Sequence, residues 1–241
     1  DITLEVTRLL LELLEKRGIE PVLFGDVAEK LERPVISRST FFNRSSAIFV
    51  VGGDGTMLGV IAEASIKGKP VMGINMGRLG FLSEIEIAEI NDALDIIAAG
   101  NYKIDERMML EVTLYREGRE LSYYALNDAV LARGALSKIL DFRVLLNESN
   151  VGDYRADGLI VSTPTGSTAY SLSAGGPVID PALRCLLLSP ICPHSLFART
   201  VVFGGDAVLE AHAVRDEDSE VFLTVDGERA LPVPDRCAIY I

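Results

Sequence analysis

The chain has 241 residues, of which 49% are apolar, and a formal net charge of −12. This length allows one large domain or two ordinary ones, and the apolar content is sufficient for a substantial core. The acidic balance argues against a nucleic-acid partner, because a surface that neutralises polynucleotide phosphates normally carries a basic surplus.

The first hundred residues alternate between helical and extended patterns. Apolar residues at helical spacing predict helices at 4–16, 56–64 and 88–99. Short apolar runs predict strands at 21–24, 47–51 and 70–74. The run at 47–51 has no polar alternation, which is typical of a parallel strand buried on both faces. The series of strand, turn, helix and strand from residue 47 to residue 74 predicts a βαβ unit.

Beyond residue 100 the pattern becomes β-rich and mainly antiparallel. A hairpin is predicted from 109–115 and 121–126, with its turn at 116–119. Further strands are predicted at 142–145, 159–162, 201–203, 208–211, 221–225 and 238–241. We therefore predict an α/β domain with a parallel sheet at 1–102 and a second, β-rich domain at 103–241.

The three cysteines, Cys185, Cys192 and Cys237, provide neither a disulfide framework nor the paired clusters of a zinc site. The number and spacing of these cysteines fit a reducing compartment, and no structural metal is expected. No apolar run is long enough to span a bilayer and no signal peptide is visible. We therefore expect no membrane partner and a cytoplasmic location.

A glycine-rich turn, Gly52-Gly53-Asp54-Gly55-Thr56, follows the predicted buried strand and opens a helix. Ligands of open parallel sheets bind outside the carboxyl ends of the strands, where this turn would lie. Its glycines permit close backbone approach, and the helix N-terminus offers free N–H groups to a polyphosphate. A carboxylate would repel phosphate there, unless Asp54 binds Mg²⁺ or accepts a proton from an attacking hydroxyl.

Simpler interpretations of the turn remain open. Asp54 could simply be the residue that caps the helix, without a role in catalysis or metal binding. A dinucleotide fingerprint is disfavoured because Leu58 stands where its third glycine would be, and no G-K-[ST] follows to make a P-loop. Arg78, after the next predicted strand, could meet a phosphate beside the turn.

A second polar segment spans residues 154–177, and eight of the sixteen residues from Ser162 to Pro177 carry hydroxyls. Hydroxyls and small residues suit sites that bind sugar and phosphate oxygens closely. Tyr170 could stack on a base or on a nicotinamide ring. Asn127-Asp128 could read an adenine edge and a pair of ribose hydroxyls, although this dipeptide is commonly only a turn.

Together these segments resemble the NAD kinase family, at residues 52–56, 75–81, 127–128, 154–177, 190–196 and 225–227. The likeness covers most of the chain, and Thr-Pro-Thr-Gly-Ser-Thr-Ala-Tyr at 163–170 is its most specific part. It implies a sandwich-like C-terminal domain and transfer of the γ-phosphoryl of ATP, with Mg²⁺, to the 2′-hydroxyl of the adenosine ribose of NAD. Glu228 departs from the family pattern, where Gln is expected.

The resemblance also implies roles for individual residues. Asp54 is the expected catalytic proton acceptor, and no protein-held metal is expected. Contacts with the dinucleotide are implied for Gly55, Asn127, Asp128, Lys138, Arg155, Asp157, Thr168, Ala169, Tyr170, Ser171, Leu172 and Ser173. Family likeness further implies a homodimer or homotetramer.

Two alternatives to an NAD kinase stay open at this point. A lipid or sphingoid kinase shares the Gly-Gly-Asp-Gly-Thr motif, but it would need an apolar entrance for acyl chains. A non-catalytic NAD-sensing module would keep the pocket and lack the transfer. An intact Asp54 argues against this second alternative.

Overall fold

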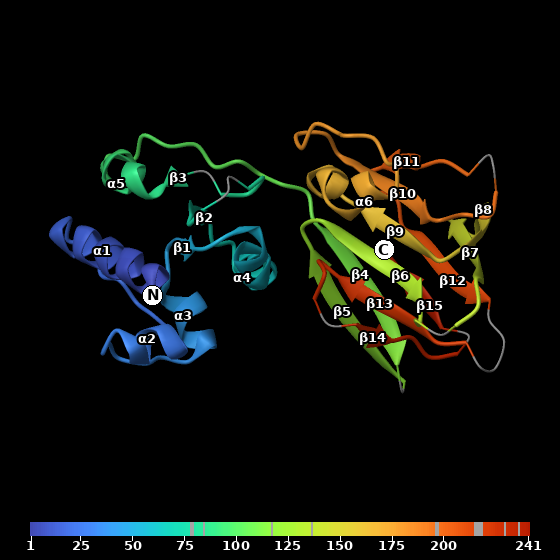
Figure 1. The fold of residues 1–241 in the computed structure, drawn as a ribbon, viewed down its shortest axis with the longest axis horizontal. Coiled ribbons are helices and arrows are strands. Elements are labelled where there is room, and N and C mark those ends of the chain that lie inside the picture. The colour runs from blue at the N-terminus through green and yellow to red at the C-terminus, as the bar shows by residue number, and fades with distance from the viewer. Residues whose placement is uncertain are drawn as a thin grey trace. The chain divides into compact units, whose positions relative to one another are not determined.

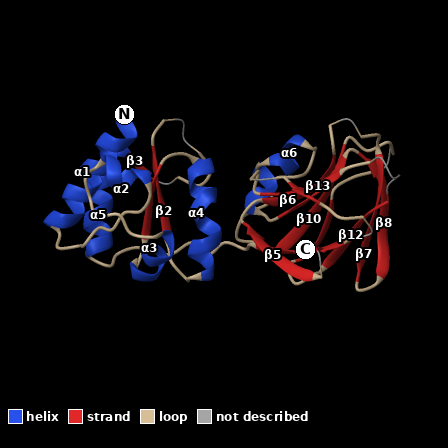
Figure 2. Ribbon diagram, turned by 90° about the horizontal axis from the view of Figure 1, so that it is seen from below, coloured by secondary structure: helices blue, strands red, loops and turns tan. Residues whose placement is uncertain are grey.

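The computed structural model describes residues 1–77, 80–83, 85–116, 118–135, 137–195, 198–214, 219–228, 230–235 and 237–241. The chain divides into two compact units, Asp1–Asp105 and Glu106–Ile241 (Figure 1). Helices predominate in the first unit and strands in the second (Figure 2). Within the described part of the chain, no helix is both long and apolar enough to cross a membrane.

The first unit contains a three-stranded parallel sheet in the order β1-β2-β3. Its elements are α1 (Ile2–Lys16), α2 (Asp26–Lys30), α3 (Arg38–Arg44), β1 (Ile48–Val51), α4 (Asp54–Ile66), β2 (Val71–Asn75), β3 (Ile85–Glu86), a 3₁₀ turn (Ile87–Glu89) and α5 (Ile90–Ala98).

Helices cover both faces of this sheet. Phe49 and Val51 of β1 pack with α1 and α5, whereas Ile48 and Val50 pack with α3 and α4. Figure 2 shows α1 and α5 on one side of β2 and α4 on the other. Since successive side chains of a strand point to opposite faces, a strand covered on both sides needs apolar residues at every position. This explains the unbroken apolar run from which the strand was predicted.

The prediction of a strand at 21–24 was wrong. Phe24 makes only an isolated parallel bridge with Ile36, and Pro21 has no backbone N–H to donate to a ladder. Residues 21–24 instead line a cleft of about 740 Å³ that they share with β1 and α1. The segment is therefore not a strand of the sheet β1-β2-β3.

The second unit is built from two six-stranded antiparallel sheets, ordered β11-β10-β9-β6-β13-β14 and β5-β4-β15-β12-β7-β8. The strands are β4 (Leu110–Arg116), β5 (Arg119–Ala125), β6 (Asp128–Arg133), β7 (Leu140–Leu146), β8 (Ser149–Ala156), β9 (Gly158–Ser162), β10 (Cys185–Ile191), β11 (Val201–Gly204), β12 (Leu209–Val214), β13 (Val221–Val225), β14 (Leu231–Pro232) and β15 (Ala238–Tyr240). A 3₁₀ turn (Thr165–Thr168) and α6 (Tyr170–Ser173) follow β9.

One apolar core joins the two sheets. It combines inward residues of both, such as Val112 and Val144 from one sheet and Leu159 and Leu188 from the other, each at most 1% exposed. Two antiparallel sheets packed face to face form a β-sandwich. The predicted fold class, an α/β domain followed by an all-β sandwich, is therefore confirmed.

Candidate active site

The glycine-rich turn lies between the end of β1 and the start of α4. A Cβ on Gly52 would come within 2.6 Å of the Thr56 hydroxyl oxygen, so this glycine permits close packing of the turn on the helix. Among the described residues, a Cβ on Gly53 or Gly55 would meet nothing within 4 Å. These two glycines leave open space at the helix N-terminus, where backbone N–H groups lack helical partners and favour an anion.

Asp54 occupies the first position of α4, between those two glycines. Its carboxylate accepts the backbone N–H of Phe81 at Oδ2 (2.9 Å) and that of Leu82 at Oδ1 (3.2 Å). Gly80 makes this approach possible, because a Cβ there would overlap the Asp54 carboxylate. A carboxylate can accept about four hydrogen bonds, so two acceptor positions remain for a ligand.

The capping interpretation of Asp54 is wrong. The N-cap residue is Gly53, which provides no side-chain cap, and the Asp54 side chain bonds to a different segment of the chain. A cap would direct the carboxylate onto its own helix. The observed bonds instead fix its orientation from outside. Arg78, proposed as a phosphate contact beside the turn, lies outside the described residues.

In the second unit, Leu126 and Asn127 form the junction between β5 and β6. The Thr163 hydroxyl donates to the carbonyl of Leu126 (2.5 Å), and its backbone N–H donates to the carbonyl of Asn127 (2.9 Å). Gly166 lies so close that a Cβ on it would be 2.6 Å from the Asn127 Cα. The start of the hydroxyl-rich segment therefore packs directly on Asn127-Asp128, as a joint site requires.

Asp128 is a buried carboxylate at the start of β6, with 5% of its surface exposed. Burial, together with the negative charge of Asp226, raises the pKa of Asp128 to about 6. The backbone N–H of Tyr170 opposes this shift, because it hydrogen-bonds to the charged carboxylate. Asp128 is thus ionised near neutral pH and placed against the first residue of α6.

The hydroxyl-rich segment separates into inward and outward side chains. Ser162, Thr163, Ser167 and Ser171 are buried, and the Ser171 hydroxyl bonds to that of Ser189 (3.0 Å). Sequence composition indicated that hydroxyls would face a ligand, but Thr163, Ser167 and Ser171 bond within the protein. The Ser162 hydroxyl has no hydrogen-bond partner among the described residues. Other side chains of the same segment are exposed. Tyr170 is 45% exposed and Leu172 is 44% exposed.

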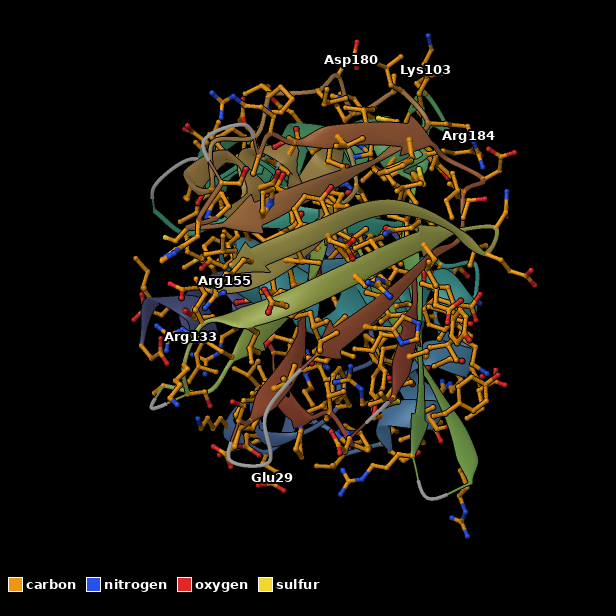
Figure 3. All side chains as sticks on the ribbon, turned by 90° about the vertical axis from the view of Figure 1, so that its right-hand side faces the viewer. Glu29, Lys103, Arg133, Arg155, Asp180 and Arg184 are labelled. Carbon is orange, nitrogen blue, oxygen red and sulfur yellow. The ribbon has the colours of Figure 1, made fainter. Side chains whose placement is uncertain are left out.

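The structure divides the predicted dinucleotide contacts of this unit into two groups. Asn127, Asp128 and residues 168–173 lie together at one end of the β6–β9 pair. Lys138, Arg155 and Asp157 lie toward the other end, where Asp157 is paired with Arg133 (2.7 Å). Figure 3 labels Arg133 and Arg155 there. In the register of this pair, Asp128 and Ala132 are four residues apart, roughly 13 Å.

Asp226 has a structural role beside Asn127-Asp128 that the sequence did not reveal. It follows β13, and its carboxylate accepts the backbone N–H groups of residues 126–128 at 2.7, 2.7 and 3.0 Å. The pair Asp226-Gly227 was a detectable signal, because Asp-Gly after a strand is typical of a tight turn with positive φ. The long-range contact with Asn127-Asp128 was not detectable from that pattern.

The fold and the site together define a phosphotransferase built from an α/β unit and a β-sandwich. Residues 4–102 match the model of the ATP-NAD kinase N-terminal domain, and residues 126–241 match that of the ATP-NAD kinase C-terminal domain. The chain belongs to the ATP-NAD kinase family.

Individual relatives agree with this membership. The chain is 38% identical over 244 residues to an NAD kinase of Caldanaerobacter subterraneus subsp. tengcongensis, covering all of this chain and 86% of the relative. It is 43% identical over 227 residues to an NAD kinase of Symbiobacterium thermophilum, covering 93% of this chain and 80% of the relative.

Two solved structures are also similar. Yeast NADH kinase complexed with NADH superposes with a TM-score of 0.91 at 27% identity, covering 99% of this chain and 75% of the other. An NAD kinase from Archaeoglobus fulgidus in complex with ATP superposes with a TM-score of 0.74 at 26% identity, covering 97% of this chain and 84% of the other.

Proposed function

We propose that this chain is an NAD kinase that transfers the γ-phosphoryl group of ATP to the 2′-hydroxyl of the adenosine ribose of NAD, giving NADP. Membership of the ATP-NAD kinase family supports this activity. The observation that carries the mechanism is the Asp54 carboxylate, held by two backbone N–H groups between glycines that leave open space.

The chemistry proposed for Asp54 is orientation and deprotonation of the acceptor hydroxyl. The 2′-hydroxyl donates to a free lone pair of the carboxylate and attacks the γ-phosphorus in line. The new O–P bond forms as the bond to the β,γ-bridging oxygen breaks, the proton passes to Asp54, and ADP leaves. Positioning and charge neutralisation supply most of the rate acceleration in such transfers.

The metal of this reaction is proposed to arrive with the substrate. Among the described residues, no group of three or more His, Cys, Asp or Glu side chains could hold a metal ion. Mg²⁺ is typically held by one or two carboxylates together with the phosphates of the nucleotide. The site therefore fits Mg²⁺-bound ATP as phosphoryl donor, and the ion neutralises phosphate charge when it is bound.

In the proposal, Asn127 and Asp128 bind the adenosine part of NAD. Asn127 offers an amide that both donates and accepts, and among the described residues its side chain has no hydrogen-bond partner. Asp128 accepts hydrogen bonds from the ribose hydroxyls. The exposed ring of Tyr170 packs against a base, and the remaining proposed contacts are Gly55, Lys138, Arg155, Asp157, Thr168, Ala169, Ser171, Leu172 and Ser173.

Several further assignments belong to the same proposal. The domain carrying the glycine turn is taken as residues 1–102, and the NAD-binding domain as residues 103–241. The active protein is a homodimer or homotetramer, for which the open sheet edges of the second unit offer pairing surfaces. The proposed location is the cytoplasm.

A panel of acceptors tests the activity against its rivals. Purified protein with ATP and Mg²⁺ is offered NAD, diacylglycerol or sphingosine, and each phosphorylated product is measured. We expect phosphorylation of NAD alone. Phosphorylation of a lipid would replace the proposal with a lipid kinase, and tight NAD binding without any product would leave an NAD-sensing module.

The pKa of Asp128 predicts how kcat/KM for NAD depends on pH. Above about pH 6 the carboxylate is ionised and accepts hydrogen bonds from the ribose hydroxyls, whereas below that pH it is protonated and this acceptor is lost. We expect kcat/KM to fall about tenfold for each pH unit below that value. A pH profile checks this, with Asp128→Asn as comparison, because that variant should be slow and should lack this limb. A limb that persists in the variant contradicts the assignment.

A further inference from the structure

The Asp226 side chain holds the Asn127-Asp128 segment through the backbone N–H groups of that segment. Three backbone N–H groups, those of residues 126–128, donate to its two carboxylate oxygens. The backbone N–H of Asp226 in turn donates to the Asp128 carbonyl at 2.9 Å. Hydrogen bonds to a charged acceptor are roughly twice as strong as neutral ones. This single side chain therefore restrains the whole junction between β5 and β6.

A tight turn holds Asp226 rigidly in this position. Asp226 and Gly227 have φ values of 49° and 71°, and the N–H of Glu228 donates to the Val225 carbonyl at 2.9 Å. Two consecutive residues with positive φ inside a four-residue turn define type I′, whose conformation matches strand twist. Asp226 therefore projects from a fixed hairpin turn.

The restraint acts on the backbone of the segment and leaves the Asn127 side chain uninvolved. Asp226 takes the N–H groups of residues 126–128, and Thr163 takes the carbonyls of Leu126 and Asn127. The backbone is satisfied from both sides by other parts of the fold, and among the described residues the Asn127 side chain has no hydrogen-bond partner. This is the arrangement expected when a segment is held ready for a ligand before the ligand arrives.

We propose that Asp226 is a positioning residue for NAD binding, which fixes Asn127 and Asp128 through their backbone without touching the dinucleotide. This inference rests on the proposed NAD kinase function. A second effect follows from its charge. Among the described residues, the negative charge of Asp226 raises the pKa of Asp128, and that of Glu228 raises the pKa of Asp226. Removal of the Asp226 charge should therefore make Asp128 easier to ionise.

Kinetics of Asp226→Asn against Asp153→Asn test the inference. The side-chain amide of an asparagine would place its own N–H groups against a backbone N–H. Two donors cannot form a hydrogen bond, so the junction should loosen. We expect KM for NAD to rise about tenfold or more, with kcat and KM for ATP changed less than about threefold. The acidic limb of kcat/KM should move to lower pH. Asp153, an exposed carboxylate bonded to Arg143 and Asn150, is the control and should change nothing.

A second variant, Asp226→Glu, and hydrogen exchange of the wild-type protein test the role of Asp226 independently. If Asp226→Asn does not fold, Asp226→Glu keeps the charge and lengthens the side chain, so KM for NAD should rise while the acidic limb stays in place. Hydrogen exchange of the wild-type protein should show protected amides at residues 126–128, and rapid exchange there would overturn the inference. Wild-type protein without NAD binding or NADP formation refutes the proposed function, whereas normal wild-type activity with an unchanged KM in the variants refutes only the role of Asp226.

Discussion

Asp54→Asn should lower the turnover of NAD by roughly 10²-fold or more while NAD still binds, which is the usual scale for loss of a general base. The carboxylate accepts two N–H groups, from Phe81 and Leu82, and has acceptor positions left for the ribose hydroxyl. An asparagine can accept only at its carbonyl oxygen, and it cannot take the proton. Steady-state rates of NADP formation and calorimetric NAD binding measure the two effects separately.

Asp26→Asn provides the matched control for this prediction. Asp26, like Asp54, is the first residue of a helix and follows a glycine that acts as N-cap without a side-chain bond. It lies on α2, outside the glycine-rich turn. Loss of a negative charge from a helix N-terminus costs less than about 1 kcal/mol at an exposed site, so this variant should keep its turnover. Equal losses in both variants would remove the catalytic role from Asp54.

Gly166→Ala should cause the largest loss of stability and of NAD binding in the second unit. The added Cβ would overlap the backbone carbonyl of Asn127, and rotation of a side chain cannot relieve a contact with backbone atoms. Either the loop after β9 or the Asn127-Asp128 segment must move. Overpacking of this kind costs about 1–3 kcal/mol or more, which corresponds to a decrease in Tm of several degrees.

The measurements for Gly166→Ala are thermal unfolding and NAD affinity, and we expect an affinity loss of at least about tenfold because both anchors of the adenosine are displaced. Gly204→Ala is the control. Among the described residues, its Cβ would approach only the carboxylate of the exposed Asp206, at 3.1 Å, and that side chain can rotate away. Normal NAD affinity in Gly166→Ala would show that the segment after β9 does not define the position of Asn127 and Asp128.

Local pattern was sufficient to predict the strand, turn and helix that carry Asp54. The apolar run at 47–51 identified β1, the glycines identified the turn, and the spacing after them identified the helix. Asp54 then follows from chain order, because a residue after such a strand must lie at the carboxyl end of the sheet. Its partners could not be predicted, since the N–H groups of Phe81 and Leu82 are 27 and 28 residues away in sequence.

The proposed NAD-binding segment around Asn127 and Asp128 depends on contacts that no local pattern encodes. Asp226 lies about a hundred residues from the backbone N–H groups that donate to its carboxylate, and the pairing of β13 with β6 brings them together. The inward orientation of Ser171 was also hidden, because a hydroxyl-rich composition is the same whether its hydroxyls face a ligand or each other. The strand β10, which contains Pro190, was missed because proline within an apolar run argues against a central strand.

The position of the transferred phosphate is the most direct test of the central claim. Wild-type protein is incubated with NAD, Mg²⁺ and ATP labelled in its γ-phosphoryl group. The position of the phosphate in the product is determined by ³¹P nuclear magnetic resonance, and the product is assayed for the label. We predict a single labelled monoester on the 2′-oxygen of the adenosine ribose. Label that appears only in inorganic phosphate, or on any other acceptor, would contradict the account.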